Sequence, residues 1–148
     1  MTGHNWIVGI GDNVLRKKVC DQYAQNEGLI NVIHPTAYVG GGVSLKKGIL
    51  IAANVSINPF AKIGKGSIIN TGSIVEHECA IGDYCHIAPG AILAGNVTIM
   101  DGSFIGANAT VKQGVTIGSN VIVGAGAVII NDISDGKTVV GNPGRVLK

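Results

Sequence analysis

A short cluster of charged residues, Glu76, His77 and Glu78, is the part of this sequence best suited to acid–base chemistry. A histidine can take up and release a proton near neutral pH, and a neighbouring carboxylate can fix its tautomer and raise its basicity. A second histidine, His86, follows nine residues after the first. Either histidine alone is more simply explained as a turn or packing residue. Together with Glu78 they predict a general base and its partners.

These residues lie within a repeat that decides the fold. From Ile33 to Ile129 an aliphatic residue occupies every sixth position without an insertion. A helix repeats its buried face every 3.6 residues and a strand every two, so a period of six predicts a coiled ribbon in which each hexad is one side of a prism. Three hexads then close one coil of eighteen residues. The expected fold class is all-β, a parallel β-helix over residues 33–134.

The composition agrees with a narrow, ladder-like core. A mean hydropathy of +0.39 allows a continuous core in this chain of 148 residues, and only 4% of the residues are aromatic. Aromatic side chains fill ordinary globular cores, whereas the narrow interior of a coiled ribbon accepts stacked Ile, Val and Leu, which explains the shortage of aromatic residues. Cys79 and Cys85 occupy the same small-residue slot of adjacent hexads and are interpreted as core filler. Three cysteines without C-x-x-C spacing disfavour a disulfide framework or a zinc ribbon.

Targeting and charge exclude few functions. No segment resembles a signal peptide, and no apolar run approaches the roughly 18 residues of a membrane span, so a cytoplasmic location without membrane partners is expected. The net charge of +2 is uninformative about partners. The one basic run, residues 16–18, is predicted to be the solvated face of a helix, and no nucleic-acid partner is expected.

The first 32 residues do not follow the hexads and are predicted to form a short β-α-β segment. The pattern indicates a strand over residues 6–10, a helix over residues 13–26 and a strand leading into Ile33, with Asp12 as N-cap and Gly28 as stop. An apolar face of the helix should let this segment dock on the first coil and cover its open edge. Its mostly apolar docking face would comprise Val14, Leu15, Lys18, Val19 and Tyr23.

Alternation along each strand sorts the outward residues onto three faces. The first face carries Leu50, Ile68, His86, Phe104 and Ile122. The second face carries Tyr38, Ser56, Ile74, Ile92, Thr110 and Val128. The third face carries Lys62, Ala80, Thr98, Thr116 and Ser134. Two faces are apolar and one is polar, and two apolar stripes meeting at one corner predict a C3 homotrimer.

The same sorting places the candidate residues. His77 lies at the edge of the second face and His86 in the middle of the first, so only the predicted trimer interface could bring them to one cleft. Gly95 lies one coil from His77 in the same corner column, and Gln113 and Asn131 follow it. That column would form a groove in which the Gly95 N–H approaches a developing oxyanion beside a basic histidine.

Residues 68–95, IINTGSIVEHECAIGDYCHIAPGAILAG, resemble bacterial sugar acyltransferases of the left-handed β-helix class. The similar group contains sialic acid O-acetyltransferases and the N-acetyltransferase that acts on a UDP-4-amino sugar. The motif N-T-x-S-x-x-E-H-E, followed nine residues after its histidine by His86, is the most specific part of the match. The closing segment, residues 141–145, is similar to the final G-x-P of the family.

The resemblance implies a left-handed coil, homotrimers, and acetyl-CoA lying between neighbouring coils. It implies that His77 is the general base, Glu78 its orienting partner and His86 a second imidazole near the thioester. By the same resemblance Asn70 and Glu76 shape the acceptor site, the Gly95 N–H contacts the acyl carbonyl, and Ala125 contacts pantetheine. Gln113 in the groove, and Arg145 with Lys148 in the tail of residues 135–148, are further candidates for contacts with CoA.

One part of the family pattern is incomplete. Members usually begin with a Rossmann-like domain whose G-x-x-G-H loop holds a nucleotide sugar, and residues 1–32 resemble only its last strand, helix and strand. This segment is therefore expected to be a remnant of a nucleotide-sugar-binding domain. Gly9 and Gly11 hint at a dinucleotide loop, but Val14 stands at the third glycine position. The identity of the acceptor stays open.

The expected function is acetyl-CoA-dependent acetylation of a sugar amino group, by direct attack with a histidine base and without a metal. O-acetylation of a sugar such as sialic acid is the nearest alternative. A β-helix carbonic anhydrase would need two closely spaced zinc ligands on one chain, whereas His77 and His86 are nine residues apart on different faces. A non-catalytic trimeric scaffold would have no use for Glu-His-Glu beside an open glycine groove.

Overall fold

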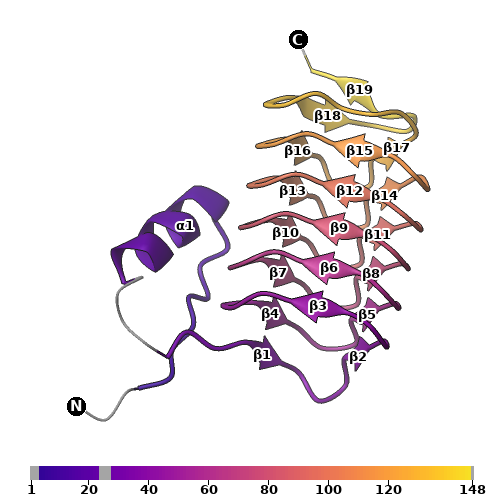
Figure 1. Ribbon diagram of the computed structural model, residues 1–148. Helices are drawn as coiled ribbons and strands as arrows, with labels where there is room; N and C mark the ends of the chain where they lie inside the picture. The colour runs from indigo at the N-terminus through magenta and orange to yellow at the C-terminus, as the bar shows by residue number, and fades with distance from the viewer. Residues whose placement is uncertain (1–3, 24–27, 148) are drawn as a thin grey trace.

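The structure is a computed structural model that describes residues 4–23 and 28–147. Within those residues the chain winds from bottom to top as a left-handed parallel β-helix, with one α-helix, α1 (Asn13–Gln22), beside it (Figure 1). The hexad prediction of an all-β fold with a single helical element near the N-terminus is confirmed. No helix in the described part of the chain is long and apolar enough to cross a membrane.

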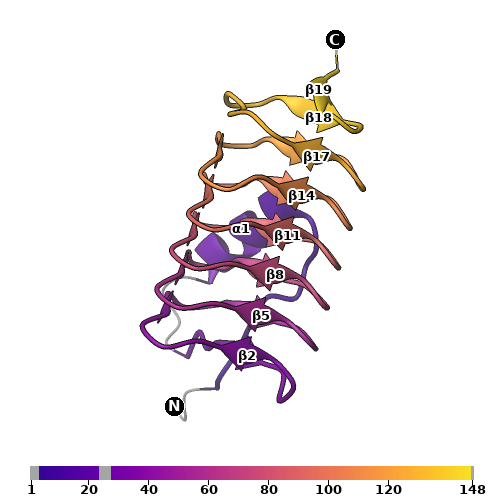
Figure 2. The same cartoon turned by 90° about the vertical axis from the view of Figure 1, so that its right-hand side faces the viewer.

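The three predicted faces are the three sheets of the β-helix. The first face runs β1 (Val32–Ile33), β4 (Leu50–Ile51), β7 (Ile68–Ile69), β10 (His86–Ile87), β13 (Phe104–Ile105), β16 (Ile122–Val123), β18 (Thr138–Val140) and β19 (Arg145–Val146). The second face, turned toward the viewer in Figure 2, runs β2 (Tyr38–Val39), β5 (Ser56–Ile57), β8 (Ile74–Val75), β11 (Ile92–Leu93), β14 (Thr110–Val111) and β17 (Val128–Ile129). The third face runs β3 (Ser44–Leu45), β6 (Lys62–Ile63), β9 (Ala80–Ile81), β12 (Thr98–Ile99) and β15 (Thr116–Ile117).

Strand register confirms the coil of eighteen residues. His86 pairs in parallel with Ile68 below and Phe104 above, and Ile92 pairs with Ile74 and Thr110. Among the strands of the described residues, only β19 is antiparallel to its partner, β18. Up to Ile129, residues eighteen apart therefore lie directly above one another, and a column of side chains can be read from the sequence by adding eighteen. In the last coil the spacing is sixteen, because Ile117 bridges to Ile133 and Val123 pairs with Val139, so the predicted position of Ser134 above Thr116 is wrong.

The core is the predicted aliphatic ladder. Every sixth residue from Ile51 to Ile129 is buried, whereas Ile33 in the first coil is 44% exposed because no coil lies beneath it. Cys79 and Cys85 are fully buried in the same ladder, which confirms their interpretation as core filler. Burial raises the pKa of the Cys85 thiol to about 12, so this thiol stays protonated and unreactive at neutral pH.

The N-terminal segment differs from its prediction in three respects. Residues 6–10 form no continuous strand, and the segments on either side of the helix pair only at the parallel bridge between Trp6 and Leu29. Asp12 caps α1 by accepting the Leu15 N–H at 2.7 Å, as predicted, but the helix ends at Gln22, and residues 24–26 lie outside the described part. Gly28 takes a left-handed φ of 103° beyond that gap and is not the residue that ends the helix.

The predicted docking face of α1 is wrong. Val14 is 76% exposed, Leu15 and Tyr23 are also exposed, and the buried helix residues are Arg16 and Cys20. The interpretation of Arg16 as part of a solvated face is therefore overturned. Nor does α1 cover the first coil, because it lies beside the middle coils (Figure 1). Arg16 holds it there through hydrogen bonds to the carbonyls of Gly66, Tyr84 and Cys85.

We expect Ile105→Ala to lower the free energy of unfolding by about 2–5 kcal/mol, because it opens a cavity in a close-packed ladder. Ile130→Ala is the matched control: Ile130 is 44% exposed, whereas Ile105 is fully buried. The control should lose less than about 1 kcal/mol. Denaturant titration at one protein concentration measures both. Equal losses would contradict this account of the core.

Candidate active site

The corner after β8 carries Glu76, His77 and Glu78. Glu78 Oε2 lies 3.1 Å from His77 Nδ1, and Glu76 Oε2 accepts the backbone N–H of His77 at 3.3 Å. A carboxylate at Nδ1 favours the tautomer that carries its proton there, which leaves the Nε2 lone pair available as a base. The His77 and Glu78 side chains are 51% and 63% exposed in the single chain, so a further wall is required to enclose a substrate.

The backbone of Glu78 is unusual. Its φ of 61° is left-handed, a conformation that costs a side-chain-bearing residue about 1–3 kcal/mol. Elsewhere at this position of the corners the left-handed residue is mostly glycine or asparagine. A glutamate held in this conformation beside His77 is consistent with a functional role, because the corner itself would accept a less strained residue.

Gly95 lies against the His77 imidazole, as the eighteen-residue coil predicts. A Cβ atom at Gly95 would stand 2.7 Å from both Cε1 and Nε2 of His77, closer than such contacts occur. Only glycine therefore leaves the ring its present position. The Gly95 backbone N–H has no acceptor within the described residues, so it is available to a ligand. A base and a hydrogen-bond donor thus share one small space.

His86 belongs to a second cluster, on the first face. It is almost fully buried, and its Nδ1 lies 3.1 Å from the carbonyl oxygen of Gly11. Its Nε2 lies 3.1 Å from Asn70 Nδ2, and its ring meets the Phe104 ring edge-on at a centroid distance of 5.1 Å. Burial lowers the pKa of His86, with a smaller contribution from the charge of Arg16, and the hydrogen bond to Gly11 acts in the opposite direction. His86 is therefore neutral at physiological pH.

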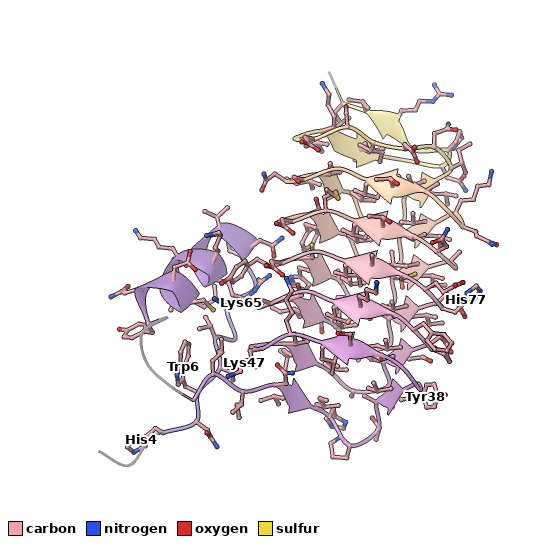
Figure 3. The ribbon with its side chains drawn as sticks, viewed as in Figure 1. His4, Trp6, Tyr38, Lys47, Lys65 and His77 are labelled. Carbon is pink, nitrogen blue, oxygen red and sulfur yellow. The ribbon has the colours of Figure 1, made fainter. Side chains whose placement is uncertain are left out.

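The structure brings the predicted residues together in two groups within one chain. His77, Glu76, Glu78 and Gly95 form one group, and His77 lies at the edge of the β-helix far from α1 (Figure 3). His86 with Asn70 forms the other group, near the start of α1. The other candidates are exposed: Gln113 in the coil above Gly95, Ala125 in the corner after β16, and Arg145 in β19. Lys148 lies outside the described residues.

A groove beside the second group was not predicted. It has a volume of about 470 Å³ between the start of α1 and the first face, with His86, Phe104, Ile122 and Val14 among its lining residues. A groove of similar size, about 490 Å³, lies along α1 and contains none of the predicted site residues. We regard the groove at His86 as the relevant one, because of these two grooves only it is lined by a predicted site residue, His86 itself. Within the described residues, no three His, Cys, Asp or Glu side chains are placed to hold a metal ion.

Sequence reasoning missed Gly11 and Arg16 as neighbours of His86. Gly11 takes part through its backbone carbonyl, which every residue type possesses, so its identity gives no signal. Arg16 sits in a basic run on a helix, a pattern typical of a solvated surface. Its burial depends on where the helix docks, and the local amino-acid pattern does not predict that position.

Comparisons with known proteins identify the family to which this β-helix belongs. The family model "Bacterial transferase hexapeptide (six repeats)" matches residues 60–95 and 96–131. A mutant of perosamine N-acetyltransferase from Caulobacter crescentus, solved with CoA and GDP-perosamine, is 40% identical, with a TM-score of 0.94 over 96% of this chain and 68% of that one. The chain belongs to the bacterial hexapeptide-repeat sugar acyltransferases.

Two further members of this acyltransferase family are similarly close. The acetyltransferase domain of PglB from Neisseria gonorrhoeae, solved with acetyl coenzyme A, is 37% identical, with a TM-score of 0.94 over 97% of this chain and 70% of that one. WeeI from Acinetobacter baumannii is 34% identical, with a TM-score of 0.91 over 95% and 69%. The comparison with curated proteins finds no match. The chain is thus an acyltransferase, as the sequence predicted.

For this acyltransferase we expect Gly95→Ala to lower kcat by at least about tenfold, because the new Cβ would push the His77 ring from its position. Gly41→Ala is the matched control, since Gly41 lies in the same corner column, three coils below Gly95, and a Cβ there meets no atom within 4 Å. Steady-state acetyl transfer by both variants tests the contact. Equal activities would show that the His77–Gly95 contact is dispensable.

Proposed function

We propose that the enzyme transfers the acetyl group of acetyl-CoA to the amino group of a nucleotide-linked sugar. The observation that carries the proposal is the His77–Glu78 pair set against the open backbone N–H of Gly95. The neighbours support both substrates, because perosamine N-acetyltransferase was solved with CoA and GDP-perosamine, and the PglB domain with acetyl coenzyme A. The N-acetyltransferase activity of the perosamine enzyme favours an amine acceptor over a hydroxyl.

The reaction follows from the geometry at His77. The sugar amine attacks the thioester carbon while His77 Nε2 takes the amine proton, and Glu78 stabilises the imidazolium through Nδ1. The Gly95 N–H donates to the carbonyl oxygen as negative charge develops there. When the C–S bond breaks, the thiolate of CoA receives the proton from His77. The products are the N-acetyl sugar and CoA.

A covalent acyl-enzyme is not required. A thioester is already activated, so positioning and proton transfer suffice. Of the candidate nucleophiles, the thiols of Cys79 and Cys85 are fully buried in the ladder, and burial raises the pKa of each thiol. Neither thiolate is available to attack a substrate. Direct transfer between the two substrates is therefore the simpler route.

We propose further that the active enzyme is a C3 homotrimer. The second face lies on the opposite side of the β-helix from α1 (Figures 1 and 2), and Tyr38 and Ile92 on it are exposed. The upper part of the first face also exposes an apolar residue, Ile122. Packing the second face of one subunit against the first face of the next would bring His77 toward the His86–Asn70 cluster of its neighbour.

The trimer gives each remaining candidate a role. Asn70 and Glu76 would border the acceptor, and Gln113 and Ala125 would line the path of the pantetheine arm along successive coils. Arg145, exposed on β19, would meet the phosphates of CoA. These assignments rest on the resemblance to the family and on the columns of the β-helix.

We expect His77→Ala to lower kcat by about 10²–10⁴-fold, the usual contribution of a general base, while the trimer persists in sedimentation analysis. The control is His34→Ala, because His34 is an exposed turn residue whose Nδ1 contacts Thr36. Thiol release from acetyl-CoA with GDP-perosamine as trial acceptor measures the rate. Near wild-type turnover of the His77 variant would remove His77 as the base.

Calorimetric titration of acetyl-CoA into wild type and Gly95→Trp tests donor binding separately from chemistry. We expect micromolar binding by wild type and its loss in the variant, whose side chain fills the groove without entering the core ladder. Circular dichroism would verify that the variant is folded. Undetectable binding by folded wild-type protein would contradict the proposed donor site.

A further inference from the structure

Arg16 is an unusual residue to find buried. It lies in the first turn of α1, is fully buried, and makes six hydrogen bonds. None of its hydrogen-bond acceptors is a carboxylate, although the charge of Asp12 lies near enough to favour the guanidinium, so burial is costly unless every donor is satisfied. The guanidinium donates to the carbonyls of Ile10, Gly11, Gly66, Tyr84 and Cys85 and to Oδ1 of Asn13, over distances of 2.7–3.1 Å.

One of these acceptors is shared with the candidate site. The Gly11 carbonyl oxygen lies 3.1 Å from Arg16 Nη1 and 3.1 Å from His86 Nδ1. A carbonyl oxygen can only accept, so His86 must carry a proton on Nδ1. Because His86 is buried and neutral, its Nε2 then has a lone pair and no hydrogen. The shared carbonyl therefore selects the tautomer of His86.

The same reasoning fixes the Asn70 amide. Asn70 Oδ1 accepts the backbone N–H of Thr71 at 2.8 Å, which identifies the oxygen side of the amide. Its Nδ2 lies 3.1 Å from His86 Nε2 and donates one hydrogen to that lone pair. The second hydrogen on Nδ2 has no acceptor within the described residues, so it is available to a substrate.

We propose that Arg16 is a positioning residue for acetyl transfer: it holds the Gly11 carbonyl where that oxygen fixes His86 as the Nδ1–H tautomer, and His86 in turn aims the Asn70 amide into the site. This inference rests on the proposed function of that site. In this arrangement His86 is a hydrogen-bond acceptor for Asn70, and the proton chemistry belongs to His77 alone.

If Arg16 served only to anchor α1, that role would explain only some of its hydrogen bonds. The bonds from Arg16 to Gly66, Tyr84 and Cys85 attach α1 to the middle coils of the β-helix. Those to Ile10 and Gly11 instead hold the chain just before the helix, where its carbonyl reaches His86. A helix anchor would leave the tautomer of His86 unaffected once the protein is folded, so the tautomer separates the two roles.

The first test uses the wild-type protein. A long-range proton–nitrogen correlation spectrum of histidine-labelled protein distinguishes the two neutral tautomers, and His86→Gln assigns the signals. We expect neutral His86 with its proton on Nδ1 at pH 7. A proton on Nε2, or a charged ring, would overturn the proposal without any reference to activity.

The second test removes the guanidinium. In folded Arg16→Ala the His86 signals should shift toward the Nε2–H tautomer or an exchanging mixture, and millimolar guanidinium ion should partly restore the wild-type spectrum. Arg16→Lys retains the charge but lacks the planar guanidinium group, so its His86 signals should also differ from those of wild type. Lys17→Ala is the matched control, because Lys17 is an exposed cation on the same helix paired with Asp21. Unchanged His86 signals in folded Arg16→Ala, or in Arg16→Lys if the alanine variant does not fold, would refute the proposal.

Kinetics then separate this inference from the proposed function. We expect Arg16→Ala to lower kcat by about 10–100-fold, the usual effect of losing an orienting group, with KM for acetyl-CoA nearly unchanged and kcat partly rescued by guanidinium. If wild-type protein transfers no acetyl group, the proposed function fails, whatever the tautomer. If wild type is active but Arg16→Ala keeps full kcat, the positioning role fails while the function stands.

Discussion

The stacking of coils every eighteen residues is the constraint on which the rest of the structure depends. Each inner coil is hydrogen-bonded to the coil above and the coil below, so up to Ile129 residues eighteen apart are neighbours whatever their chemistry. This places Gly95 against the His77 ring and lets a glycine in one coil shape the surroundings of a histidine in another. Catalytic residues on such a scaffold are arranged along columns of the β-helix. Their relative positions are fixed because the stacked coils are rigid.

Much of this could be predicted because the determinants are local. The aliphatic period and the alternation of strand side chains predict the ladder, the three faces and the contact between His77 and Gly95 without knowledge of any long-range contact. The position of α1 could not be predicted in this way. Its apolar residues Val14 and Leu15 are exposed, and the helix is held by Arg16, whose acceptors are mostly backbone carbonyls. Backbone acceptors leave no trace in the amino-acid pattern.

The corners explain why one strained residue lies at the site. Each corner needs one residue in the left-handed conformation, and glycine or asparagine meets that need at little cost. Glu78 takes this position beside His77 and so combines a structural requirement with a carboxylate that is fixed relative to the imidazole. A carboxylate on a relaxed loop would lose more conformational entropy on orienting the base. The strained backbone thus contributes to preorganisation of the pair.

The two groups of site residues differ in a way that follows from their surroundings. His77 is exposed on a corner, where its lone pair can reach a substrate and its charge can be solvated or paired with Glu78 during turnover. His86 is buried among Phe104, Asn70 and the Gly11 carbonyl, where a second proton would lack an acceptor and would displace Asn70. The half-coil of nine residues between them is hydrogen-bonded to the coils on both sides, so the two histidines are held on different faces of one chain. In the trimer that we propose, a site that uses both would be completed by a second subunit, and catalysis would then depend on assembly.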